Sequence, residues 1–308
     1  MSDPHARALV ALGEALRARG YRFITSTPAT HARVFARRAE ARDVRDVLGF
    51  SLPFRREVLE PALLSLLEQA DALDVQPDGR LRARVRVSSL ARAPGEDALY
   101  VHGAYPTESA DAVFFGPDTY RFCAFLARAR VPARYVVDIG CGSGAGGLVA
   151  AHAGGAARLV LADVNPRALA LAAVNAALQG RAVSCVQSDV LAGVDGAPDL
   201  IVANPPYMRD HAARAYRDGG GAYGEALSVR IAREALARLA PGGTLLLYTG
   251  APVVDGVDVF HAQLAPLLRG LTHHYEELDP DVFGEELDQP GYEHVERIAA
   301  IGVRVLKP

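Results

Sequence analysis

The sequence predicts an α/β protein with a Rossmann-like, doubly wound and mostly parallel sheet, and with a smaller N-terminal domain of helices and a β-hairpin. Two observations support this fold class. From residue 135 onward, short apolar runs alternate with segments of helical periodicity, which is typical of a parallel sheet covered on both faces. From residue 4 to about residue 73 the periodicity is helical. We therefore expect one domain over residues 1–110 and a second over residues 111–308.

The N-terminal region begins with helical patterns. Residues 5–19 and 57–72 repeat leucine at the spacing of one helix face. A turn signal, Pro77-Asp78-Gly79, follows them. Residues 80–87 then alternate between arginine and apolar residues, as a strand with one buried face does. Helices followed by a hairpin predict a winged-helix-like module.

Four arginines lie on one side of the predicted strand over residues 80–87. They are Arg80, Arg82, Arg84 and Arg86. Four guanidinium groups on one face can form a docking surface for phosphate or for an acidic partner. They can equally mark a solvated edge strand, where charge discourages pairing with other chains. The nearly neutral composition around them favours the solvated edge.

The larger domain is expected to contain six strands of this sheet and four helices. The predicted strands cover residues 135–139, 158–162, 182–187, 200–203, 243–248 and 298–305. The predicted helices cover residues 146–153, 166–179, 225–239 and 260–268. Asn165 is expected to cap the helix that begins at Pro166. In such sheets ligands bind beyond the carboxyl ends of the strands.

Composition excludes several classes of protein. The 308 residues are 50% hydrophobic and carry a net charge of −3, which argues against a surface coated for nucleic acid. No apolar stretch approaches the roughly 20 residues that span a bilayer, and the N-terminus lacks the apolar core of a signal peptide. We therefore expect no membrane partner and a cytoplasmic location. The three cysteines show no metal-ligand spacing, so no metal is predicted.

A glycine-rich turn follows the predicted strand over residues 135–139. The segment runs from Asp138 to Ala145, with Gly140, Cys141, Gly142 and Gly144 in the turn. Such glycines permit a tight bend and let a ligand approach the backbone. The spacing also fits the dinucleotide fingerprint, so the turn by itself leaves an NAD-dependent oxidoreductase open. His211 is the nearby histidine that such an enzyme would offer as acid or base.

Three aspartates lie at the ends of three successive predicted strands. Asp138 would repel a pyrophosphate and attract an α-amino group, Asp163 is placed to bond both hydroxyls of a ribose, and Asp189 is placed to accept from an adenine amine. An amine, a ribose and an adenine are the polar parts of S-adenosylmethionine. The predicted cofactor site also includes Val164 and Val190, which follow the second and third aspartates.

A rigid turn follows the predicted strand over residues 200–203. It reads Asn204-Pro205-Pro206-Tyr207. The prolines fix the backbone and remove N–H donors, which leaves the Asn204 side-chain oxygen and the Pro205 carbonyl as acceptors beside an aromatic ring. Two fixed acceptors suit the two hydrogens of a planar –NH2 group. We assign all four residues to catalysis, and Asn204 to the cofactor site as well.

These motifs resemble those of the class I S-adenosylmethionine-dependent methyltransferases, from about residue 115 to the C-terminus. The resemblance implies a seven-stranded methyltransferase sheet and S-adenosyl-L-methionine as cofactor, held at the glycine turn and by the three aspartates. Asn-Pro-Pro-Tyr is similar to the motif of enzymes that methylate a glutamine side-chain amide in proteins or an exocyclic amine of a nucleic-acid base.

Two further segments resemble the HemK-like release factor glutamine methyltransferases. They are the glycine-rich residues 218–225 and the Pro-x-Thr segment at residues 115–119. The glycines are equally consistent with a mobile loop. The sequence departs from that subfamily at Tyr248-Thr249-Gly250, where an acidic residue is usual.

The leading hypothesis is methyl transfer to a planar nitrogen, first of all a glutamine amide of a protein substrate recognised by the N-terminal domain. A base amine of RNA or DNA, or a small molecule with an amide or amine, is the alternative acceptor.

Overall fold

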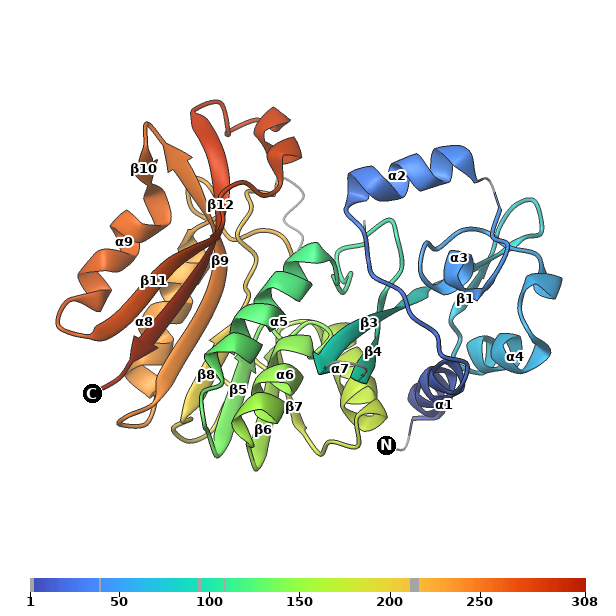
Figure 1. Cartoon of the computed structure of the whole chain (residues 1–308), viewed down its shortest axis with the longest axis horizontal. Helices are drawn as coiled ribbons and strands as arrows, with labels where there is room; N and C mark the ends of the chain where they lie inside the picture. The colour runs from blue at the N-terminus through green and yellow to red at the C-terminus, as the bar shows by residue number, and fades with distance from the viewer. Residues whose placement is uncertain (1–2, 39, 94–95, 108, 211–215) are drawn as a thin grey trace.

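The computed structural model describes residues 3–38, 40–93, 96–107, 109–210 and 216–308. The chain runs from an N-terminal group of helices and hairpins into a large sheet with the C-terminus at its far end (Figure 1). The N-terminal helices are α1 (Pro4–Ala18), α2 (Pro28–Arg37), α3 (Val44–Leu48), the 3₁₀ helix η1 (Arg56–Val58) and α4 (Pro61–Gln69). The N-terminal strands are β1 (Leu73–Val75), β2 (Leu81–Ala83), β3 (Val85–Ala93) and β4 (Glu96–Gly103).

Local signals explain where these helices begin. The Asp3 carboxylate accepts from the backbone N–H groups of His5 and Ala6 at the start of α1. Thr27 caps α2 in the same way, and each of these helices has proline in its first turn. The second predicted helix, over residues 57–72, is shorter than expected, because it divides into η1 and α4.

The single strand predicted over residues 80–87 is wrong. The chain changes partner at Arg84, whose backbone N–H bonds to the Ala72 carbonyl, so that β2 pairs with β1 and β3 pairs with β4. The break separates the four arginines, which therefore do not form one face. Only Arg84 of the four is exposed, and Arg86 is buried, with 3% of its surface exposed.

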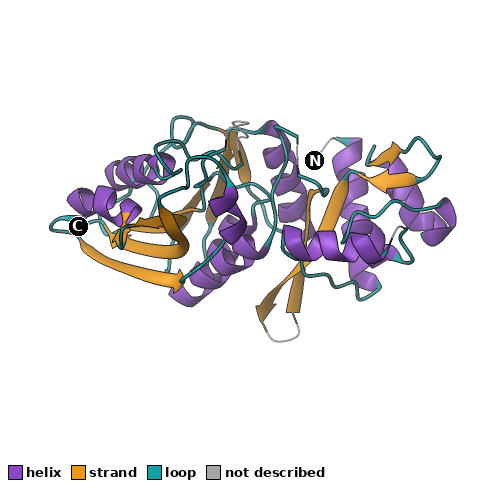
Figure 2. Ribbon diagram, turned by 90° about the horizontal axis from the view of Figure 1, so that it is seen from above, coloured by secondary structure: helices purple, strands orange, loops and turns teal. Residues whose placement is uncertain are grey.

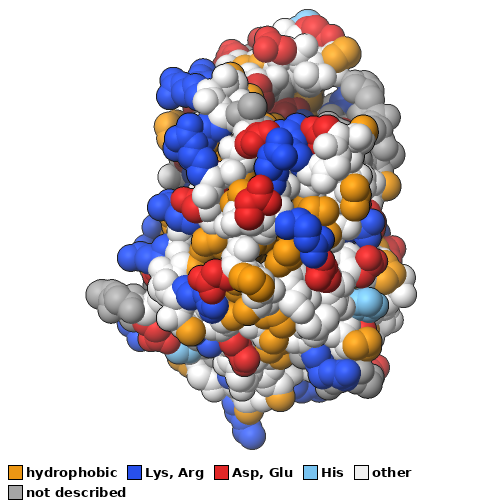
Figure 3. Space-filling view, turned by 90° about the vertical axis from the view of Figure 1, so that its right-hand side faces the viewer, with side chains coloured by type: hydrophobic (Ala, Val, Ile, Leu, Met, Phe, Trp, Pro, Cys, Tyr) orange, Lys and Arg blue, Asp and Glu red, His pale blue; other side chains and the backbone are white. Residues whose placement is uncertain are grey.

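The arginines also have partners within the chain. Arg80 pairs with Asp78, Arg84 pairs with Asp74, and Arg82 donates to the Ser51 carbonyl. Arg86 donates to the Gly103 carbonyl. Over the N-terminal face in Figure 3, basic and acidic side chains are interspersed. Neither one solvated edge nor one docking surface describes these four residues, because each guanidinium group bonds to a carboxylate or a backbone carbonyl of the N-terminal region.

The large sheet contains the remaining strands. In chain order they are β5 (Tyr135–Ile139), β6 (Arg158–Asp163), β7 (Ser184–Gln187), β8 (Leu200–Ala203), β9 (Thr244–Val254), β10 (Val257–Asp258), β11 (Thr272–Asp279) and β12 (Val295–Leu306). The spatial order is β11-β12-β9-β8-β5-β6-β7, and β10 pairs with β9. The strands from β7 to β9 are parallel, whereas β12 is antiparallel to both of its neighbours. The predicted seven-stranded, mostly parallel sheet is confirmed.

Helices cover both faces of this sheet, as Figure 2 shows from above. They are α5 (Pro117–Ala129), α6 (Ala145–Gly154), α7 (Pro166–Leu178), α8 (Ala226–Arg238) and α9 (Val259–Leu268), with a 3₁₀ helix, η2 (Gly284–Asp288), before β12. The apolar side chains of α5 and α6 pack with one face of the central strands, and those of α8 and α9 pack with the other. The cap predicted for α7 is confirmed, because Asn165 Oδ1 accepts from the Arg167 N–H at 2.9 Å.

Helix α7 joins the two regions. Ala172 and Ala176 contribute to the core under the sheet. Leu171 and Leu178, on its other side, pack with the N-terminal helices and hairpin. A continuous apolar contact therefore links the regions, and the domain boundary near residue 110 stays a prediction.

Candidate active site

Three neighbouring strands of the sheet end at the same edge. Ile139 at the end of β5 is in register with Ala162 of β6 on one side and with Ala203 of β8 on the other. The residues that follow, including Asp163 and Asn204, therefore lie side by side around one cavity. The cavity lining includes the predicted site residues Asp138, Gly140, Cys141, Gly142, Asp163, Val164, Asp189, Val190, Asn204, Pro205, Pro206 and Tyr207.

Gly140 and Gly142 face open space within this cavity. Both have positive φ, and a Cβ added to either would meet no atom within 4 Å. The backbone here can therefore be approached by a ligand. Gly144, which the sequence assigns to the same role, is not part of the lining. A Cβ on it would meet Leu161 and Ala172, so this glycine lets α6 pack against its neighbours.

Asp138 lies deepest on this side of the cavity. Its Oδ2 accepts from the Gly147 N–H at 2.7 Å, and the residue is 1% exposed. Burial raises the pKa of its carboxyl to about 7, although the bond from Gly147 opposes the shift. A cationic group bound beside Asp138 would favour the ionised form, so the site suits an amine.

Asp163 is held by the backbone on both of its oxygens. Oδ2 accepts from the Gly142 N–H and Oδ1 from the Asn165 N–H, each at 2.9 Å. Burial raises the pKa of this carboxyl, while the two bonds lower it. The bonds fix the carboxylate at the end of β6, and each oxygen keeps lone-pair capacity for a ligand hydroxyl.

Asp189 differs from the other two aspartates because it is exposed and already paired. Arg230 of α8 donates to both of its oxygens at 2.9 Å. The Arg230 hydrogen bonds hold the pKa of the Asp189 carboxyl below its usual range. A ligand amine at this position would therefore share the carboxylate with Arg230, a partner that the sequence did not indicate.

On the other side of the cavity, Asn204 is anchored by Asp118 of α5. Asn204 Nδ2 donates to Asp118 Oδ2 at 3.3 Å. In the described part of the chain, Asn204 Oδ1 is buried and has no hydrogen-bond partner. A buried acceptor of this kind is costly unless a ligand satisfies it. Asp118 was not assigned from the sequence, although it lies in the Pro-x-Thr segment that was singled out.

Glycines pack directly behind the Asn-Pro-Pro-Tyr turn. A Cβ on Gly219 would lie 2.6 Å from the Pro206 carbonyl oxygen, and one on Gly224 would lie 2.4 Å from the Tyr207 carbonyl oxygen. A Cβ on Gly250 would lie 2.3 Å from the Tyr207 ring. The glycine-rich segment at residues 218–225 therefore supports the motif by close approach.

Aromatic side chains form a further part of the cavity wall. Phe114 and Tyr216 stack with ring centroids 6.4 Å apart, and the Phe283 ring meets the Tyr207 ring at 6.0 Å. Tyr216 also donates to the Thr107 carbonyl at 2.5 Å. Phe114, Tyr216 and Phe283 line the cavity, and the sequence carried no signal for them, because they come from three loops without a motif.

Three further expectations concern a histidine, a metal site and a membrane-spanning helix. His211 lies outside the described residues. Among the residues that the structure describes, no cluster of three or more histidine, cysteine or acidic side chains is placed to hold a metal ion. Within the same residues, no helix has the length and apolar character needed to cross a bilayer.

Comparison with known proteins places this fold and site in a class. Residues 122–251 match the methyltransferase small domain family. A release factor glutamine methyltransferase of Cereibacter sphaeroides is 32% identical over 234 residues, covering 68% of this chain and 78% of that protein. The protein is thus a methyltransferase by family. More narrowly, it belongs to the class I S-adenosylmethionine-dependent methyltransferases with an NPPY motif, in the HemK-like family of release factor glutamine methyltransferases.

Two further relatives share shorter segments. The release factor glutamine methyltransferase of Deinococcus radiodurans is 40% identical over 129 residues, covering 38% of this chain. The chain spans only 46% of that relative's length. Ribosomal RNA small subunit methyltransferase C of Chromohalobacter salexigens is 40% identical over 118 residues, covering 38% of this chain and 31% of that protein.

Proposed function

We propose that this protein transfers a methyl group from S-adenosylmethionine to the side-chain amide nitrogen of a glutamine in a protein. The observation that carries the proposal is the orphaned acceptor at Asn204, a buried Oδ1 on a residue that lines the same cavity as Asp138 and Asp163. One cavity then accommodates the cofactor on one side and a planar –NH2 group on the other.

The cofactor would be held by residues at the carboxyl ends of β5, β6 and β7. Asp138 would attract the α-amino group, the open backbone at Gly140 and Gly142 would lie against the methionyl part, and Asp163 would accept from the ribose hydroxyls. Asp189 would accept from the adenine amine in competition with Arg230. When bound, S-adenosylmethionine supplies an electrophilic methyl group on a sulfonium.

The acceptor side explains why a weak nucleophile would react. The lone pair of an amide nitrogen is delocalised into its carbonyl group. Asn204 Oδ1 and the Pro205 carbonyl would accept the two N–H hydrogens, which orients the nitrogen and favours its pyramidal form in the transition state. Tyr207 would pack on the planar group. No strong base is required, because the nitrogen loses its proton after it has gained the methyl group.

A protein acceptor is favoured over nucleic acid by the charge distribution. The four arginines at residues 80–86, which offered the strongest basic cluster in the sequence, bond within the chain. Two relatives are release factor glutamine methyltransferases, so a translation release factor is the first acceptor to test. Because one relative is a ribosomal RNA methyltransferase, a base amine of RNA is the second candidate acceptor.

One experiment separates these acceptors. The protein is incubated with methyl-labelled S-adenosylmethionine and a cell lysate, and the products are digested with protease or with nuclease. We expect protease alone to convert the label into small fragments, and an Asn204→Ala variant to transfer about 10²–10³-fold less label. Label released only by nuclease would overturn the glutamine proposal in favour of a base amine.

A further inference from the structure

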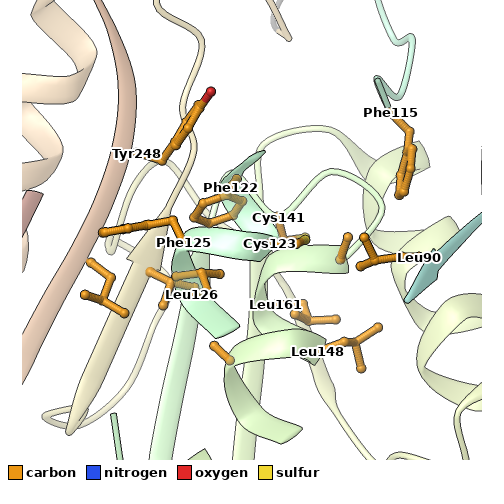
Figure 4. Close-up of a cluster of buried hydrophobic side chains, with 14 of the residues drawn as sticks. Leu90, Phe115, Phe122, Cys123, Phe125, Leu126, Cys141, Leu148, Leu161 and Tyr248 are labelled. Atoms are coloured by element: carbon orange, nitrogen blue, oxygen red, sulfur yellow. The ribbon is translucent and has the colours of Figure 1, made fainter. Parts of the chain in front are cut away.

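Tyr248 of β9 is a fully buried tyrosine with a polar contact at the active site. Its ring packs near Phe122 in the apolar cluster, and its hydroxyl oxygen points away from that cluster (Figure 4). The hydroxyl donates to Asp118 Oδ1 at 2.5 Å. Tyr248 belongs to the triplet at which the sequence departs from the release factor subfamily.

Asp118 connects Tyr248 to the catalytic motif. One carboxylate oxygen accepts from Tyr248 and the other accepts from Asn204 Nδ2. An ionised carboxylate can only accept hydrogen bonds. Asn204 must therefore turn its –NH2 group toward Asp118, which directs Oδ1 to the opposite side. That atom is the buried acceptor without a partner.

We propose that Tyr248 is a positioning residue, whose hydroxyl, acting through Asp118, fixes the Asn204 amide with Oδ1 facing the acceptor amine. The inference rests on the proposed function and explains how the Asn204 amide is oriented in the acceptor site. If Asp118 took up a proton, its O–H could donate to Asn204 Oδ1 and the amide would rotate. Asn204 would then present –NH2 to the –NH2 of the acceptor, and two donors cannot bond.

The protonation state of the Asp118 carboxyl depends on burial and on its hydrogen bonds, which act in opposite directions. Burial raises the pKa of the Asp118 carboxyl, and the bond from Tyr248 is the strongest opposing contribution. The other groups that face it are Tyr207 from the motif and Arg121 from its own helix. Arg121 is engaged by Asp279 of β11 at 2.9 Å. Removing the Tyr248 hydroxyl should therefore favour the protonated carboxyl.

The composition of the chain permits a direct test. The protein contains only three asparagines, so selective ¹⁵N-asparagine labelling gives three side-chain –NH2 signals in an NMR spectrum. The Asn204 signal is identified by its loss in Asn204→Ala. The other two signals are internal controls, because Asn175 donates to the Val101 and Ser143 carbonyls and Asn165 donates to the Asp111 carbonyl.

We expect the Asn204 signal of the native protein to move as the pH falls and Asp118 takes up a proton. In Tyr248→Phe the midpoint should lie about one pH unit or more higher, the size expected for the loss of a hydrogen bond to a charged group. In Asp118→Ala the dependence should disappear. Unchanged Asn175 and Asn165 signals show that each variant is folded. The same midpoint in Tyr248→Phe as in the native protein would overturn the proposal.

Kinetics give a second readout. Tyr248→Phe should lower kcat about tenfold, with KM for the acceptor and Kd for S-adenosylmethionine nearly unchanged. The matched control is Tyr135→Phe, because the Tyr135 hydroxyl is bonded to the Asp195 carbonyl, apart from Asp118 and Asn204. A native protein that methylates no glutamine would refute the proposed function, whereas the NMR titration tests the positioning role independently of any acceptor.

Discussion

The two sides of the cavity are built in different ways. On the cofactor side, each carboxylate lies at or just beyond the carboxyl end of one strand, so Asp138, Asp163 and Asp189 are placed by local chain geometry. On the acceptor side, Asn204 is held by Asp118, 86 residues away in the chain, and Asp118 is held by Tyr248, 130 residues away. A local arrangement can be seen in a sequence, whereas a chain of contacts between distant segments cannot. Substitutions on the cofactor side should mainly lower the affinity for S-adenosylmethionine, whereas substitutions on the acceptor side should mainly lower turnover.

The largest effect is expected for Asn204→Ala. The change removes the orphaned acceptor and should lower turnover about 10²–10³-fold, as the loss of one fixed hydrogen-bonding group at a transition state does. The affinity for S-adenosylmethionine, measured by calorimetry, should change less than about twofold, because Asp138 and Asp163 remain. Turnover of Asn204→Ala at the native rate would contradict the proposed difference between the cofactor side and the acceptor side.

Asp163→Ala should affect the opposite side. The variant loses charge-assisted bonds to the ribose, so we expect the affinity for S-adenosylmethionine to fall about 10–100-fold in calorimetry. Turnover at saturating cofactor should stay within a few fold of the native value. Asp281→Ala, which removes an exposed carboxylate elsewhere, is the matched control. An unchanged affinity in Asp163→Ala would refute the assigned ribose contact.

The pKa of Asp138 gives a third difference between the sides. Because burial raises this pKa to about 7, Asp138 loses its charge as the pH falls through that value, and its attraction for an amine is lost with it. Relative to Asp138→Asn, the native affinity for S-adenosylmethionine should therefore fall about tenfold between pH 8 and pH 6. The same pH dependence of the affinity for S-adenosylmethionine in the native protein and in Asp138→Asn would contradict the role of Asp138.

The smallest effect is expected for Arg230→Ala. Its ion pair with Asp189 is exposed, and exposed pairs contribute little. The change frees Asp189 for the adenine amine, so the affinity for S-adenosylmethionine should rise by no more than about threefold. A loss of affinity in calorimetry would instead mean that Arg230 holds Asp189 in its binding position.

The sheet and the strand-end residues could be predicted because they depend on periodicity and on short motifs. The alternation after residue 135 predicted the parallel strands, and Asn165 with Pro166 predicted the start of α7. The strand predicted over residues 80–87 was wrong, because strict alternation does not reveal that the chain changes partner at Arg84.

The support of the acceptor site could not be predicted. Gly219, Gly224 and Gly250 approach the motif so closely that a Cβ would clash, but nothing in their local sequence indicates that they contact Pro206 and Tyr207. Tyr248 similarly looks like one apolar residue of a buried strand until its hydroxyl is seen beside Asp118. Such contacts become visible only when the strands are assembled.

The central claim is that one cavity brings a sulfonium methyl group and a glutamine amide together. The most direct measurement is tandem mass spectrometry of a purified translation release factor after incubation with the protein and S-adenosylmethionine. We predict one added methyl group on a glutamine side-chain nitrogen, formed about 10²–10³-fold more slowly with Asn204→Ala than with the native protein. A methyl group on another atom, or equal methylation by the Asn204→Ala variant, would contradict the claim.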